Sequence, residues 1–66
     1  MPITFKINER VIITKKKYSG CIGKIVSYNN WGRMREYLIR LSPYRCQQLK
    51  GYNVLYFYPG EFARLE

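Results

Sequence analysis

The sequence predicts an all-β fold, a small barrel of five strands that is closed or partly open, for two reasons. Apolar residues recur mostly with a period of two, which is typical of half-buried strands, rather than with the 3.6-residue period of a helix. Turn-forming residues separate these segments at short intervals, and no segment favours a helix of about ten residues or more. Because closure removes exposed sheet edges, short strands in a chain of this size favour a barrel.

Four segments carry the strand pattern: 10–14, 22–28, 37–41 and 54–58. In the first, Val11 and Ile13 share one face, and in the third Tyr37, Ile39 and Leu41 share one face. The second is rich in β-branched residues, and the fourth is apolar or aromatic on both faces. The segments between them contain Gly, Pro, Asn or Ser, and these turns are expected at 18–20, 29–32, 42–51 and 59–60.

The C-terminal residues predict the last strand. Phe62 and Leu65 are three positions apart, a spacing that suits a single short 3-10 turn leading into a closing strand with both side chains facing the core. Tyr37, Phe57 and Phe62 are expected to fill that core.

The composition excludes most enzyme chemistry. The 66 residues include 12 Lys or Arg, 4 Asp or Glu and no His, and the formal net charge is +8 at pH 7. Without His the chain has no imidazole ligand for zinc and no general base that ordinarily titrates near neutrality. We therefore expect a protein that is not an enzyme and uses no metal or cofactor. The length allows one small core, so residues 1–66 are expected to form a single domain.

A cytoplasmic protein without membrane contact is the default expectation. The longest apolar run, Val54–Tyr58, is far shorter than the about 20 residues that span a bilayer, and no apolar run of secretory-signal length is present near Met1. Cys21 and Cys46 lack the spacing of a metal site, and in such a compartment they are expected to be reduced thiols. Sequence alone does not place them near each other, so whether they pair stays open.

Three segments resemble a known domain type. Residues 8–13 and 18–26 resemble the KOW motif of ribosomal proteins and transcription elongation factors, in which a polar turn precedes one strand and a G-x-x-G-x-V segment opens the next. Gly20 permits a left-handed turn, and Gly23 lets the second strand approach a neighbour closely. Residues 59–65 resemble the last turn and strand of SH3-like barrels. The resemblance implies an SH3-like barrel of the KOW type, and such domains commonly bind RNA or ribonucleoprotein.

Positive charge is concentrated in the predicted connections. Between Arg10 and Tyr58 the chain has ten basic residues and one acid, Glu36. Basic side chains that neutralise phosphates release counterions, and exposed rings beside them stack on unpaired bases. The connection 42–52 is long, as functional loops often are, and it contains two glutamines suited to hydrogen bonds with bases. The candidate nucleic-acid-binding residues are Lys15, Lys16, Lys17, Tyr18, Lys24, Trp31, Arg33, Arg35, Tyr44, Arg45, Lys50 and Tyr52.

We therefore expect a small basic module that binds nucleic acid. RNA or single-stranded DNA is favoured over base-specific binding to a duplex, because no recognition helix is visible that would enter a major groove. The alternative is a protein-docking accessory subunit, similar to the basic SH3-like subunits of photosynthetic and redox assemblies, or a phage-type factor, whose basic face binds an acidic protein. A further alternative is a surface charged only for solubility. The Tyr58-Pro59 pair also resembles the type II dihydrofolate reductases, but bulky Tyr56 and Phe57 replace their pore-facing residues. Oligomeric state, sequence preference and the choice among these partners stay open.

Overall fold

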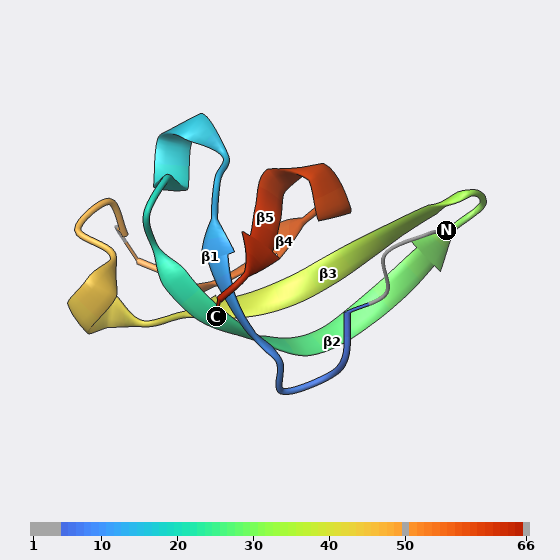
Figure 1. The fold of residues 1–66 in the computed structure, drawn as a ribbon, viewed down its shortest axis with the longest axis horizontal. Coiled ribbons are helices and arrows are strands. Elements are labelled where there is room, and N and C mark those ends of the chain that lie inside the picture. Colours follow the sequence, from blue (N-terminus) through green and yellow to red (C-terminus); the bar gives the residue numbers. More distant parts are fainter. Residues whose placement is uncertain (1–4, 50, 66) are drawn as a thin grey trace.

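Figure 1 shows the computed structural model of the chain, which describes residues 5–49 and 51–65. Over these residues the chain forms one antiparallel sheet of five strands in the order β4-β3-β2-β1-β5. The strands are β1 (Arg10–Ile13), β2 (Ile22–Trp31), β3 (Met34–Leu41), β4 (Val54–Phe57) and β5 (Phe62–Arg64). The prediction of an all-β chain is confirmed.

The sheet is open, because β4 and β5 are its two edges and the pairing of the described strands does not join them. The hydrogen-bonded sheet of the described strands therefore does not close into a barrel. The sheet is nevertheless strongly curved, as Figure 1 shows for β2 and β3. A β-bulge contributes to this curvature, since the register between β2 and β3 shifts between Ile25 and Ser27.

Short 3-10 turns connect the strands: η1 (Lys16–Tyr18), η2 (Pro43–Arg45) and η3 (Pro59–Glu61). A 3-10 turn precedes the last strand as expected, but it is η3 at Pro59–Glu61, because Phe62 already belongs to β5; Phe62 is buried, whereas Leu65 is only half-buried and lies outside the core. The Tyr58 N–H donates to Oε1 of Glu61, and the Glu61 N–H donates back to the Tyr58 carbonyl, at 2.8 Å each. This reciprocal pair satisfies backbone groups that the start of the turn would otherwise leave exposed.

The core lies on one face of the sheet, here called the inner face. Residues alternate across each strand, so that Val11, Ile13, Ile39 and Leu41 are buried as predicted. The predicted core rings Tyr37, Phe57 and Phe62 are also buried. Phe5 was not expected there, yet its ring centroid lies 4.6 Å from that of Phe62 and 5.5 Å from that of Tyr37. Phe5 therefore covers one part of the inner face.

The predicted turn at 29–32 is wrong. Strand β2 continues through Trp31, and the turn consists of Gly32 and Arg33 alone, with Gly32 at φ 61°. Two cross-strand contacts extend the hairpin: Arg35 Nε donates to Asn30 Oδ1 at 2.9 Å, and the Trp31 indole donates to Glu36 Oε1 at 2.9 Å. These cross-strand pairs outweigh the turn preference of the asparagines.

The expectation of reduced thiols is also wrong, because Cys21 and Cys46 form a disulfide. Their Cα atoms lie 4.6 Å apart and both side chains are buried. The bond ties the residue before β2 to the residue after η2, across a sequence separation of 25. It therefore anchors the connection that leads from β3 to β4.

Within residues 5–49 and 51–65, no helix has the length and apolar character needed to cross a membrane.

Candidate functional site

Three basic side chains stand in one line across the sheet. Arg10 of β1 is directly opposite Lys24 of β2, and Lys24 is directly opposite Arg40 of β3. All three are exposed and lie on the outer face, the side of the sheet away from the core. Directly opposite residues in antiparallel strands have Cα atoms about 4.5–5.5 Å apart. We call Arg10, Lys24 and Arg40 the cation row.

The described acids are engaged elsewhere. Glu9 forms an ion pair with Arg64 and accepts the backbone N–H of Lys6 at 2.9 Å. Glu61 forms an ion pair with Lys15 at 3.0 Å. The third acid, Glu36, accepts the hydrogen bond from the Trp31 indole.

These contacts lower the pKa of two of the carboxyl groups. The Lys6 backbone N–H, with the Arg64 guanidinium, holds the pKa of Glu9 below its ordinary value. The Tyr58 N–H, with the Lys15 ammonium, does the same for the pKa of Glu61. In the part of the chain that the structure describes, the cation row has no ion-pair partner. Its three charges therefore face solvent uncompensated by these acids.

A pocket of about 230 Å³ lies beside the cation row. Hydrogen bonds with Asn53 hold one part of its wall at the end of β3: the Leu41 N–H donates to the Asn53 carbonyl at 2.6 Å, and Asn53 Nδ2 donates to the Leu41 carbonyl at 3.3 Å. The Ser42 N–H donates to the Ile22 carbonyl at 2.8 Å. The residues that line the pocket are Arg10, Ile22, Gly23, Lys24, Arg40, Leu41, Ser42, Pro43 and Asn53.

The connection between β3 and β4, here called the stapled connection (residues 42–53), borders this pocket. Its tyrosines are almost fully exposed, with 96% of Tyr44 and 88% of Tyr52 accessible to solvent. Tyr44 directly follows the lining residue Pro43, and Tyr52 directly precedes the lining residue Asn53. Arg45 is also exposed. Both exposed rings therefore belong to residues that are chain neighbours of the pocket lining.

The disulfide and Gln48 hold the stapled connection against the sheet. Gln48 Nε2 donates to the Ser19 carbonyl at 3.2 Å, and Gln48 Oε1 lies 3.3 Å from Sγ of Cys21. Because a disulfide sulfur carries no proton, the second contact is packing rather than a hydrogen bond. Gln48 was a candidate for base recognition, but its amide is used within the fold.

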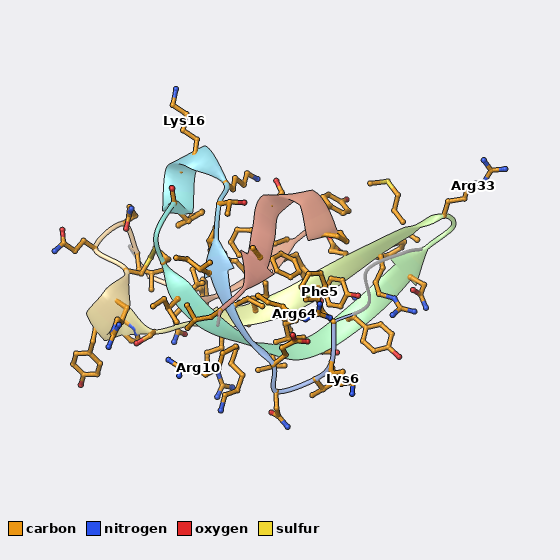
Figure 2. The ribbon with its side chains drawn as sticks, in the orientation of Figure 1. Phe5, Lys6, Arg10, Lys16, Arg33 and Arg64 are labelled. Carbon is orange, nitrogen blue, oxygen red and sulfur yellow. A yellow bond between two sulfur atoms is a disulfide. The ribbon has the colours of Figure 1, made fainter. Side chains whose placement is uncertain are left out.

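The predicted residues of the first connection lie on another side of the molecule. Figure 2 shows Lys16 and Arg10 pointing away from opposite sides. Tyr18 is not a free stacking surface, because it is half-buried and its ring meets Phe57 edge-on at 5.9 Å. Lys17 lies 5.5 Å from the centroid of the same ring. Lys15 is the residue already paired with Glu61.

The third predicted group lies at the end of the β2–β3 hairpin. Figure 2 places Arg33 at this tip, far from Arg10. Trp31 is exposed as expected, whereas Arg35 is tied to the hairpin, with its guanidinium 4.4 Å from the centroid of the Tyr28 ring. Of the predicted residues, Lys24 lines the pocket, and Tyr44, Arg45 and Tyr52 belong to the connection that borders it, apart from the groups at η1 and at the hairpin tip. Lys50 lies outside the described residues.

Arg10 and Arg40 were not among the predicted residues, because most of those lie in connections, whereas these two belong to strands, as Lys24 does. A signal was present, since each stands next to a core residue, Val11 or Ile39, at a position that alternation turns outward. Their alignment with Lys24 depends on the register of three strands, which no local pattern supplies.

Comparison of the chain with protein-family models, with curated proteins and with solved structures finds no match.

Proposed function

We propose that this protein is a small, non-enzymatic module that binds single-stranded nucleic acid, RNA or DNA. One arrangement carries the proposal: the cation row lines a pocket, and the connection that contributes Ser42, Pro43 and Asn53 to the same pocket carries the two most exposed tyrosines, Tyr44 and Tyr52. In a complex of this kind the cations neutralise phosphates, and the rings stack on unpaired bases. The contact surface is therefore the outer face around the cation row together with the stapled connection.

A salt titration tests both binding and its location. Fluorescence anisotropy with fluorescein-labelled oligo(dT) and oligo(U) gives the affinity at several salt concentrations. Each neutralised phosphate of a single strand contributes about −0.7 to the slope of log K against log salt. The double variant Arg10→Gln/Arg40→Gln is therefore expected to flatten the slope by about 1.4.

The matched control removes two charges from η1, in the double variant Lys16→Gln/Lys17→Gln. These two lysines have no ion pair in the described part of the chain, so this variant changes net charge by the same amount. We expect a much smaller change in slope. Equal slopes for the two doubles would refute the location, and a wild-type protein that binds neither oligonucleotide at low salt would refute the function.

Stacking is tested separately from charge. Tyr44→Ala and Tyr52→Ala are each expected to weaken binding by about 1–3 kcal/mol, the contribution of one stacked base. Tyr58→Ala serves as the control, because Tyr58 is an exposed tyrosine beside η3 rather than in the stapled connection. Losses of the same size in all three variants would contradict stacking at the pocket.

An acidic protein is the alternative partner for the same basic surface. Purification of the tagged protein with and without nuclease separates the two possibilities. Loss of the bound material on nuclease treatment supports nucleic acid. Retention of a stoichiometric acidic protein that protects the cation row from solvent favours the alternative.

We further propose that the topology is SH3-like and of the KOW type. Two observations support it: η3 directly precedes β5, and β5 returns to pair with β1 at the far edge from β4. Slow amide exchange and contacts between β4 and β5 in solution would show a closed barrel, and their absence would refute closure.

The cytoplasmic location stays a prediction. The disulfide points the other way, because structural disulfides persist mainly in oxidising compartments. Trapping of free thiols with an alkylating reagent in intact cells reports which state the native protein has. A fully alkylated pair would support a reducing location, and a protected pair an oxidising one.

A further inference from the structure

The pocket beside the cation row concentrates more positive charge than one internal phosphate of a strand needs. Arg10, Lys24 and Arg40 occupy adjacent strands, so two strand spacings of about 4.8 Å each span the whole row. All three residues also line the same pocket. Their long side chains can therefore converge on one anion.

The chemistry of that anion follows from charge matching. A phosphodiester inside a strand carries one negative charge, whereas a phosphate monoester carries about −1.5 to −2 at pH 7 and has three terminal oxygens as acceptors. Two arginines and a lysine provide N–H donors for all three oxygens, and arginine binds phosphate oxygens with two N–H groups at once. The monoester is the better match for three clustered cations.

The walls of the pocket strengthen this preference. Ile22, Leu41 and Pro43 contribute apolar surface, which can pack against the sugar attached to the phosphate. Ser42 adds a hydroxyl, a neutral hydrogen-bond donor. Because backbone hydrogen bonds from Ser42 and Leu41 fix this wall, little needs to rearrange when an anion enters.

The size of the pocket limits what enters it. Its volume of about 230 Å³ lies below the range of about 300–1,000 Å³ that is typical of sites enclosing a whole drug-sized ligand. A phosphate with part of its sugar is therefore a suitable occupant, with the adjoining bases outside the pocket.

We propose that this pocket binds the terminal phosphate of a nucleic acid strand, so that the protein prefers phosphorylated ends over interior positions. This inference rests on the proposed function, since it adds an end preference to single-strand binding. The recognised group is a phosphate monoester dianion attached to a nucleotide.

Competition binding tests the inference. A fluorescein-labelled oligo(dT) reporter is displaced by unlabelled ten-nucleotide oligo(dT) that carries a 5′-phosphate, a 3′-phosphate or hydroxyls at both ends. We expect at least one phosphorylated competitor to be about tenfold stronger than the unphosphorylated one, equivalent to about 1.4 kcal/mol. Arg40→Gln and, independently, Lys24→Gln are expected to abolish the difference, whereas Arg33→Gln at the hairpin tip preserves it.

The outcomes separate the two proposals. Reporter binding with three equal competitors overturns the end preference and leaves the proposed function standing. A reporter that does not bind at all overturns both. Inorganic phosphate serves as an additional competitor. If it removes the difference in affinity between phosphorylated and unphosphorylated oligonucleotides at concentrations that do not displace the unphosphorylated one, the dianion site is supported. An end preference that survives in both Arg40→Gln and Lys24→Gln places the site elsewhere and overturns the assignment of the pocket.

Discussion

Replacement of Lys24 by Gln is expected to stabilise the fold while it weakens nucleic-acid binding. Lys24 stands between Arg10 and Arg40, directly opposite both across the sheet. Like charges in directly opposite positions destabilise a sheet, and the described acids form their ion pairs elsewhere. A side chain that destabilises the fold but contacts a ligand is expected to show both effects when it is replaced: higher stability and weaker binding.

The magnitude follows from Coulomb's law. Two unit charges about 6 Å apart in water repel by about 0.7 kcal/mol, and Lys24 takes part in two such pairs, so its neutralisation relieves about 1.4 kcal/mol without salt. At 0.15 M ionic strength the Debye length of about 8 Å reduces this to about 0.7 kcal/mol. For a domain of this size that energy raises the melting temperature by about 3–6 °C.

Thermal unfolding followed by circular dichroism, at 10 mM and at 1 M salt, measures the effect. Lys24→Arg keeps the charge and should leave the melting temperature near that of the wild type. Arg33→Gln removes a charge from the hairpin tip and should show a smaller gain. A Lys24→Gln protein that melts lower than the wild type, or whose gain is the same at both salt concentrations, refutes the reasoning.

Three further predictions concern stability. Reduction of the disulfide should lower the free energy of unfolding by about 3.5 kcal/mol, from the loop entropy of its separation of 25 residues, and unchanged urea midpoints with and without reductant would exclude this. Gly23→Ala should lower the free energy of unfolding by about 1–3 kcal/mol or more, because the new Cβ would lie 2.7 Å from the Arg40 carbonyl oxygen. Gly60→Ala is the control and should be nearly neutral, because there is open space around Gly60. Similar melting temperatures for the two variants would contradict this packing. The pKa values of Glu9 and Glu61 are lowered by folding, so their stabilisation is present above the ordinary value of 4.5 and is lost as the pH falls through the folded values. The double variant Glu9→Gln/Glu61→Gln should therefore have a flatter acid-unfolding profile, and an unaltered profile would argue against it.

The strands were predictable from alternation, but their register was not. Val11 and Ile39 mark their strands locally, because every second residue must face the core. The pairing that aligns Arg10, Lys24 and Arg40 depends on contacts between distant segments and on the bulge after Ile25. For this reason only Lys24 of the cation row, the centre of the candidate site, was predicted from the sequence.

Two other differences also arise from contacts between strands or segments. The 29–32 segment has strong turn residues, and only partners across the hairpin, such as Arg35 for Asn30, keep it extended. The spacing of Cys21 and Cys46 carries no information on the distance between their Cα atoms, so pairing became visible only with the fold. By contrast, the exposed Tyr44 and Tyr52 were correctly expected in the long connection, where local composition is informative.

The position of Trp31 has a spectroscopic consequence. It is the single tryptophan of the chain, it is 62% exposed, and it lies beside the hairpin tip, which Figure 2 shows on the side of the molecule away from Arg10. Its indole emission should therefore stay constant while a ligand occupies the pocket and change only when a partner touches the hairpin. Without any added label, the protein thus contains its own fluorescent reporter for a second surface, independent of the first.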